Sequence, residues 1–231
     1  TLSNLFVDKK IDLQLGYEIV NNKGFSLVQE ADNKVIPIRK TLENYDFFVS
    51  SEIKATEKFS IRPGIRASAQ SKFKDQQASS LALRYLLEKG IEIRGSYGNS
   101  FRTPSFEELY SKQIFDGHFF AGNENLIPET STSYEMSFKK NSFLASDLQI
   151  NTTFSGSFLN IKNRIDMALV RFNTDTGNPE YEYINISKYK MWNFSTTNQF
   201  KKENWTFNIG AAIIGISQKI ENQVFASNEK Y

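Results

Sequence analysis

The sequence has no cysteine and a single histidine, His118. These two shortages exclude a disulfide framework, cysteine-rich zinc sites, thiol catalysis and any metal site that needs two imidazoles. Charges of the two signs nearly balance, with 28 Lys and Arg against 26 Asp and Glu, so the net charge of +2 gives no basis for attraction to nucleic acid. We therefore expect no metal centre, no cofactor and no nucleic-acid partner.

Long apolar runs and catalytic motifs are missing as well. Nowhere do about 18 apolar residues follow one another, and residues 1–10 lack a basic segment followed by an apolar run, so we expect neither a transmembrane helix nor a signal peptide. The nucleophile elbow G-x-S-x-G, the zinc motif H-E-x-x-H, and the phosphate-binding and dinucleotide-binding glycine motifs do not occur. Because no pair of nucleophile and base can be identified, we expect no catalytic residues and no enzymatic activity.

Aromatic residues, in contrast, are plentiful. Phe, Trp and Tyr make up 14% of a chain that is only 39% hydrophobic, which indicates β structure with much wetted surface. Apolar and polar residues alternate with period two, as in residues 11–20, and this pattern predicts strands. It occurs in residues 11–20, 44–55, 59–70, 78–87, 91–102, 130–139, 148–158, 181–200 and 205–217. We expect about ten strands, many of roughly 9 to 12 residues.

The connections between these strands alternate in length. Short turns at 8–10, 56–58, 88–90, 140–146 and 201–204 are interleaved with longer segments at 21–43, 71–77, 103–129 and 172–180. Outer-membrane barrels have short periplasmic turns at one rim and long extracellular loops at the other. The sequence therefore predicts an all-β fold, an antiparallel up-and-down transmembrane β-barrel that is present in part, with the four longer segments at one rim.

A soluble β-sandwich is the main alternative, because it also produces alternating strands. Strands in soluble sheets centre near about 5 to 6 residues, whereas a tilted strand that spans a bilayer needs about 9 to 11. Aromatic residues near the strand ends suit interfacial girdles, although they would also suit a sandwich core. In the barrel, Ile91, Ile93 and Tyr97 should face lipid, while Glu92, Arg94 and Ser96 should face the lumen. A secreted adhesin-type module and a passive porin-like barrel remain open.

Two motifs resemble a conserved stretch of TonB-dependent receptor barrels. In that family a strand ends in an FRxPS-like box followed by ELY, and a GNxxLxPExSxxYE box opens the next strand. The first box is similar to Phe101, Arg102, Thr103, Pro104 and Ser105, with Glu108, Leu109 and Tyr110 following. The second is similar to Gly122, Asn123, Leu126, Pro128, Glu129, Ser131, Tyr134 and Glu135.

This resemblance implies that residues 1–231 form part of a receptor barrel domain and that the family's plug domain, with its TonB-contacting segment, lies outside them. Full barrels of the family have about 22 strands, so we expect a fragment. The implied function is TonB-dependent uptake of a scarce solute, such as an iron-siderophore, haem, cobalamin or an oligosaccharide, across the outer membrane of a Gram-negative bacterium. The implied partners are TonB, through the plug, outer-membrane lipid and a small-molecule or oligosaccharide ligand.

The residues of the two boxes also have a structural explanation. Pro104 and Pro128 should end β pairing because proline lacks a backbone donor, and Gly122 permits unusual dihedral angles. Residues 105–110 are short and polar enough to form one helical turn. In this explanation, the residues of the two boxes determine the conformation of the loop.

The loop between the boxes is the best candidate for ligand contact, since it is long and aromatic. The candidate residues are Tyr110, Phe115, His118, Phe119 and Phe120. His118 lies between FRTP and NENL, and haem receptors of the family carry a ligating histidine between similar boxes, so a role as an axial haem ligand is one hypothesis. A histidine without a ligating role is the other.

Four arginines lie on the polar faces of predicted strands: Arg62, Arg66, Arg84 and Arg94. In a barrel they would line the lumen, where they could attract anionic ligands or pair with carboxylates of the plug. The alternative is that they form salt bridges within the lumen wall.

Overall fold

The computed structural model describes residues 10–29, 35–115, 117–144, 147–221 and 226–230. These residues form long strands and one short helix, whose bounds are β1 Ile11–Gln29, β2 Val35–Lys54, β3 Phe59–Gln70, β4 Gln76–Leu87, β5 Ile91–Arg102, α1 Phe106–Tyr110, β6 Lys112–Phe115, β7 His118–Ala121, β8 Glu129–Leu144, β9 Leu148–Phe172, β10 Pro179–Lys202, β11 Trp205–Glu221 and β12 Ala226–Lys230. In these ranges no helix is both long and apolar enough to cross a bilayer.

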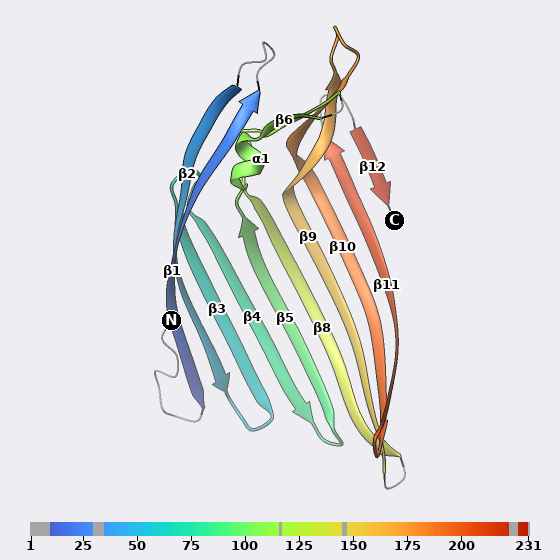
Figure 1. Cartoon of the computed structure of the whole chain (residues 1–231). Helices are drawn as coiled ribbons and strands as arrows, with labels where there is room; N and C mark the ends of the chain where they lie inside the picture. The colour runs from blue at the N-terminus through green and yellow to red at the C-terminus, as the bar shows by residue number, and fades with distance from the viewer. Residues whose placement is uncertain (1–9, 30–34, 116, 145–146, 222–225, 231) are drawn as a thin grey trace.

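The strands pair into a single antiparallel up-and-down sheet, in the order β1-β2-β3-β4-β5-β8-β9-β10-β11-β12. Ten strands therefore lie on the main path of the sheet, and β6 and β7 belong to a hairpin within one loop. The sheet is strongly curved, as part of a barrel wall (Figure 1). The predicted fold class is confirmed, and the β-sandwich alternative is wrong because these strands form one continuous sheet.

The predicted rims are confirmed by the order and direction of the strands. The connections β3–β4, β5–β8 and β9–β10, and the paired ends of β1 and β2 at Gln29 and Val35, lie at one end of the sheet, which we call the long-loop rim (Figure 1). The connections β2–β3, β4–β5 and β10–β11, and the paired ends of β8 and β9 at Leu144 and Leu148, lie at the other end, the short-turn rim. Of the predicted short turns, 8–10 lies mostly outside the described residues, and so do residues 145–146.

Three predicted boundaries are wrong. The link predicted at 140–146 is strand as far as Leu144, which pairs with Leu148 at the start of β9. The segment 21–43 was expected to be a loop, but β1 and β2 remain paired in register from Ile11–Ile53 to Gln29–Val35. The strand expected at 148–158 also continues, so that β9 runs to Phe172 alongside β10. Both hairpins extend well past the level at which β3, β4 and β5 end (Figure 1).

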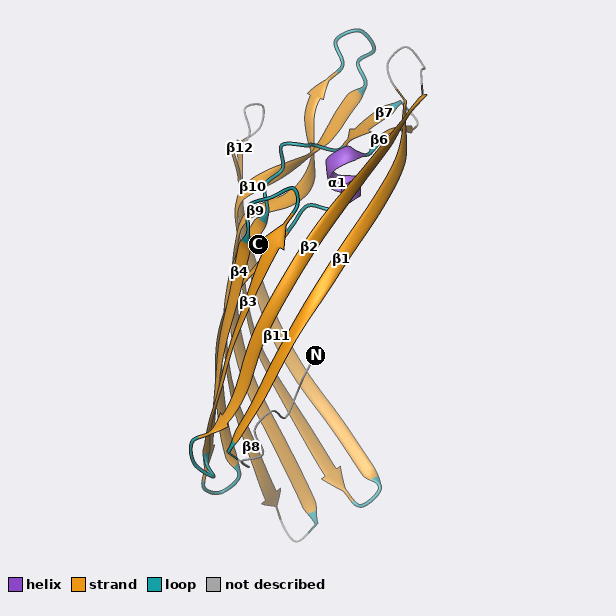
Figure 2. Ribbon diagram, turned by 90° about the vertical axis from the view of Figure 1, so that its left-hand side faces the viewer, coloured by secondary structure: helices purple, strands orange, loops and turns teal. Residues whose placement is uncertain are grey.

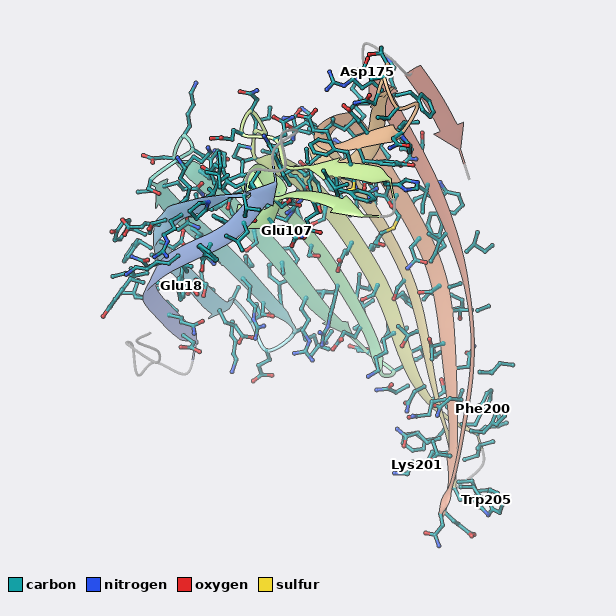
Figure 3. All side chains as sticks on the ribbon, turned by 45° about the horizontal axis from the view of Figure 1, so that its top comes forward. Glu18, Glu107, Asp175, Phe200, Lys201 and Trp205 are labelled. Atoms are coloured by element: carbon teal, nitrogen blue, oxygen red, sulfur yellow. The ribbon has the colours of Figure 1, made fainter. Side chains whose placement is uncertain are left out.

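The two faces of the sheet differ in chemistry. We call inward the concave face on which α1 lies (Figure 2), and outward the opposite face. The orientation predicted for β5 is supported for Ile93 and Tyr97, which line the apolar outward groove and not the polar inward hollow of about 590 Å³. Glu92 and Arg94 form an ion pair with each other at 2.6 Å, and Arg94 and Arg84 both line the inward hollow. Figure 3 shows the same alternation near the short-turn rim, where Phe200 and Trp205 point away from the side of Lys201.

Candidate functional site

The candidate site is the segment 103–128, which joins β5 to β8 at the long-loop rim. Arg102, the last residue of β5, ties the two motif boxes together. Its guanidinium donates to Glu108 Oε2 at 2.9 Å and to Glu129 Oε1 at 2.7 Å. Glu129, the first residue of β8, also accepts from the backbone N–H of Ile165 at 2.6 Å. One arginine thus links β5, α1 and β8, and Glu129 extends the link to β9.

The helix α1 begins with a capping box. The Ser105 hydroxyl oxygen accepts from the Glu108 N–H at 3.2 Å, and the Ser105 N–H donates to Glu108 Oε2 at 2.7 Å. This reciprocal pair satisfies backbone donors that a helix start leaves open. Burial raises the pKa of the Glu108 carboxyl, but the hydrogen bonds from Arg102 and Ser105 outweigh it, so the pKa lies below its usual range. The predicted helical turn over 105–110 is confirmed.

A small apolar cluster holds the segment against the inward face. Leu109, Tyr110, Leu126 and Ile165 are buried together, and Tyr183 packs against them. The Tyr110 hydroxyl accepts from Lys72 Nζ at 2.8 Å. Tyr110 was a candidate for ligand contact, but its side chain is only 6% exposed. Its ring is therefore part of the packing that positions the loop.

Pro104 and Pro128 lie directly outside the paired strands, as predicted, because β5 ends at Arg102 and β8 begins at Glu129. Phe101 is still within β5, opposite Thr130. Gly122 differs from the expectation, because it is not among the glycines with positive φ. A Cβ at Gly122 would lie 2.6 Å from the Leu109 carbonyl carbon and 2.7 Å from the Tyr110 nitrogen. Glycine is needed here for close backbone approach.

Asn123 connects the second box to α1 and β10 by hydrogen bonds. Its N–H donates to the Glu108 carbonyl at 2.8 Å, and its side-chain amide donates to the Tyr183 carbonyl of β10 at 3.0 Å. Asn185 holds the next residues, accepting from the Ile127 N–H and donating to the Ile127 carbonyl, both at 3.0 Å. The loop-shaping explanation of the boxes is consistent with all of these contacts.

Between the boxes, β6 and β7 form a hairpin that reaches across the inward side at the rim (Figure 3). There β7 pairs in parallel with the upper part of β10, with Phe119 opposite Glu180 and Phe120 opposite Tyr181. The antiparallel pairing of β10 with β11 begins only at Lys188. The hairpin thus places β7 beside residues 180–182 of β10, a part of β10 that does not pair with β11.

This pairing brings three aromatic rings together, two of them predicted and one not. The rings of His118 and Phe120 are stacked with centroids 6.3 Å apart, and Phe120 and Tyr181 with centroids 5.2 Å apart. His118 also stacks on Tyr181 at 6.1 Å. All three side chains are half-buried, as is that of Phe119. Phe115 pairs with His118 through the backbone, and its side chain lies outside what the structure describes.

Charged groups border the stack on β9 and β10. Glu180 pairs with Arg171 and accepts from the Asn173 side chain at 3.0 Å. These hydrogen bonds, the one from Arg171 foremost, hold the pKa of Glu180 below its usual range. Burial raises the pKa of the neighbouring Glu182. In the described part of the chain, no group of three or more His, Cys, Asp or Glu side chains is arranged to hold a metal ion.

The four predicted arginines all form ion pairs within the inward face. Arg62 contacts Glu52 at 2.7 Å, Arg84 contacts Glu92 at 2.7 Å, and Arg94 contacts Glu92 at 2.6 Å. Arg66 contacts Asp46 at 2.5 Å and Glu18 at 2.7 Å. The salt-bridge alternative is therefore the one that the geometry supports.

An antiparallel sheet with one apolar face, one polar face, and alternating short turns and long loops is the wall of a transmembrane β-barrel. The family model described as TonB dependent receptor-like, beta-barrel matches residues 3–224, and the chain belongs to this family. A comparison with curated protein sequences gives no match.

Solved structures with the same fold include siderophore receptors and a metal transporter. The siderophore receptor PirA from Pseudomonas aeruginosa has a TM-score of 0.68 and 17% identity over 91% of this chain and 42% of its own. A ferric enterobactin receptor (PfeA) mutant from Pseudomonas aeruginosa has 0.62 and 14% over 91% and 44%. The copper transporter OprC has 0.63 and 11% over 94% and 39%. The chain thus spans less than half the length of each of these structures.

Proposed function

We propose that this chain is part of the wall of an outer-membrane receptor that imports a scarce solute with energy delivered through TonB. The observation that carries the proposal is the outward face of β10. Its outward positions between Lys190 and Lys202 are Trp192, Phe194, Thr196, Asn198 and Phe200, three of them aromatic and none charged. At about 3.3 Å per residue and a tilt near 45°, the two lysines are about 28 Å apart along the membrane normal, close to the height of the apolar band of outer-membrane barrels.

The remaining roles follow from this placement. The apolar outward face contacts outer-membrane lipid, and the long-loop rim, with the segment 103–128, faces the outside. The inward face, with its arginine–carboxylate pairs, encloses the passage and contacts a plug through which TonB acts. The chemistry is binding and transport, without catalysis.

For the solute we propose a ferric siderophore, captured at the rim by the loop 103–128 together with β9 and β10. The support is the fold shared with a siderophore receptor and a ferric enterobactin receptor, and the aromatic stack of His118, Phe120 and Tyr181 at the rim. Flat aromatic rings offer apolar contact to the aromatic groups of such a ligand. Haem, cobalamin and oligosaccharides are the competing ligands.

The test uses the full-length receptor in the bacterium that carries it. Cells with and without the receptor gene, and cells that lack TonB, are supplied with radioactive iron as ferric enterobactin. Uptake that requires both the receptor and TonB, and stops when the proton gradient is collapsed, supports the proposal. Uptake that continues without TonB would contradict energised import. Uptake of haem, cobalamin or a maltodextrin in place of iron would move the receptor to that ligand class.

A further inference from the structure

The β6–β7 hairpin carries two rings of the aromatic stack and reaches β10 from a base at residues 108–111 and 122–124 (Figure 3). We call these two short segments the hairpin base. The Gly122 N–H donates to the Ser111 carbonyl at 2.6 Å, and the Asn123 N–H donates to the Glu108 carbonyl at 2.8 Å. These bonds join the chain before the hairpin to the chain after it. Side chains that contact the hairpin base therefore influence the direction in which the hairpin reaches toward β10.

Lys72, in the connection between β3 and β4, contacts both segments of the hairpin base. Its ammonium group donates to the Tyr110 hydroxyl at 2.8 Å and lies 3.9 Å from Glu124 Oε2. Tyr110 precedes the hairpin in the sequence, and Glu124 follows it. Only 25% of the Lys72 side-chain surface is exposed, so water competes little for the ammonium group. One side chain from another connection thus joins the two segments.

The connection that carries Lys72 is itself fixed to β2. The Ser71 N–H donates to the Glu43 carbonyl at 3.0 Å, and the Glu43 N–H donates to the Ser71 hydroxyl oxygen at 2.9 Å. Phe73, the residue after Lys72, packs against the apolar cluster that contains Leu109. The backbone of Lys72 is therefore held on both sides, and its ammonium group is a fixed point for the hairpin base.

The tip of the hairpin is sensitive to the angle at the hairpin base. Each strand of the hairpin has four residues, so the hairpin extends about 13 Å at about 3.3 Å per residue. Over that length, a rotation of about 10° at the base moves the tip by about 2 Å, whereas a binding site has to hold its groups within about 0.5 Å. At the tip, β7 pairs with β10 through only three residue pairs, in parallel. The position of the stack therefore depends on the contacts at the base.

We propose that Lys72 is a positioning residue for solute binding. By joining Tyr110 to Glu124, it holds the β6–β7 hairpin in the direction that forms the aromatic stack. Hydrogen bonds from a charged donor are stronger than those between neutral groups, and this one acts on a hydroxyl that is held by a buried ring. The inference rests on the proposed function, because that function makes the stack a contact for the solute. Lys72 acts through the hairpin base and does not itself touch the solute.

The test combines equilibrium binding of radioactive ferric enterobactin to the full-length receptor with hydrogen exchange of the same protein without ligand. Lys72→Met keeps the aliphatic stem and removes the ammonium group, and it should weaken binding by about fivefold or more, as expected for one lost hydrogen bond. Exchange in 118–121 should accelerate, whereas exchange in 106–109 should stay as in the wild type, because the capping box of α1 remains. The matched control Lys74→Met removes one lysine from the same connection and should leave both measurements unchanged.

A conservative variant and a double-mutant cycle identify the contact through which Lys72 acts. Lys72→Arg keeps a charged donor and should bind within about twofold of the wild type. Tyr110→Phe removes only the hydroxyl group and should weaken binding. Because the same contact is lost, combining Tyr110→Phe with Lys72→Met should weaken binding no further than Lys72→Met alone. Losses that multiply would show that the two residues act independently and would overturn the inference.

Unchanged binding by Lys72→Met would also overturn the inference. So would faster exchange in 106–109 together with 118–121, or failure of Lys72→Arg to restore binding, because either result would make Lys72 a general structural residue. A wild type that does not bind ferric enterobactin contradicts only the proposed solute. In that case, exchange in 118–121 of Lys72→Met and Lys74→Met still decides whether Lys72 positions the hairpin.

Discussion

At the scale of single residues, Gly122 shows how tightly the loop 103–128 is built. A methyl group there would press on backbone atoms of Leu109 and Tyr110, which cannot move aside like a side chain. Gly122→Ala should therefore destabilise the loop by about 1 to 3 kcal/mol. Hydrogen exchange of the full-length receptor should show faster exchange in 105–128 than in the wild type.

Gly95→Ala is the control for this change. A Cβ at Gly95 would meet no described atom closer than the Glu135 carbonyl oxygen at 4.0 Å, so the exchange of the loop should stay as in the wild type. If Gly122→Ala also left the exchange unchanged, the close backbone approach at Gly122 would not contribute to the stability of the loop.

His118 allows a direct test of the competing ligand haem. Imidazole coordinates haem iron, and the rings of Phe120 and Tyr181 beside it could contact a porphyrin face. If the full-length receptor takes up haem, His118→Ala should weaken haem binding and alter the Soret band. Titration of the wild type without any Soret change would exclude haem, and unchanged affinity in the variant would remove His118 from the site.

The candidate residues were found from the sequence only in part. His118, Phe119 and Phe120 could be predicted because they stand in a long aromatic loop between two boxes. Tyr181 was missed because its place in the stack depends on the parallel pairing of β7 with β10, which no local pattern reveals. The burial of Tyr110 could not be predicted, because it arises from residues far away in the sequence, among them Leu42, Ile165 and Tyr183.

At the scale of elements, the helix α1 should respond to acid through Glu108. The lowered pKa of Glu108 means that its ion pair with Arg102 and its cap contact with Ser105 contribute full stability above the usual glutamate pKa of about 4.3. The contribution is lost as the pH falls through the lowered pKa, while Arg102 stays charged. Hydrogen exchange in 105–112 should accelerate over that acidic range.

Glu108→Gln removes the titrating group while keeping the shape of the side chain. Its exchange in 105–112 should already be faster at neutral pH and should change less on acidification than that of the wild type. A variant whose exchange rises with acid as steeply as the wild type would assign the effect to another group.

The long hairpins were the elements that the sequence analysis missed. Within a bilayer, one face of each strand must be apolar, and this requirement produces the alternation. The hairpin ends of β1–β2 and β9–β10 lie beyond the apolar band, where both faces contact water or protein. Neither face of these strand ends therefore has to be apolar. Residues 21–24, Asn-Asn-Lys-Gly, carry no period-two signal although they are paired in register. These strands are held by backbone pairing and by side-chain contacts without a period-two pattern, such as the hydrogen bond from Asn21 to Glu43.

At the scale of the whole molecule, the two faces predict opposite responses to the same charge. Ile93→Arg puts a guanidinium on the outward face and should cost about 2 to 4 kcal/mol near the bilayer midplane. Ser96→Arg puts it on the inward face, which already carries Arg84 and Arg94, and should cost much less. Unfolding of the full-length receptor in lipid vesicles measures both. Equal costs would mean that the faces have been assigned wrongly.

The pairing of β7 with β10 constrains the order in which the molecule can assemble. The main-path strands are paired in the order in which they follow one another in the sequence, so the sheet can grow strand by strand along the chain. The strand β7 is made before β9 and β10 but has no place to dock until β10 has been laid down. We therefore expect the β6–β7 hairpin at the long-loop rim to dock only after β9 and β10 have joined the sheet. In pulse-labelled refolding, amides of 118–121 should gain protection later than those of β4 and β5, and simultaneous protection would contradict this sequence of events.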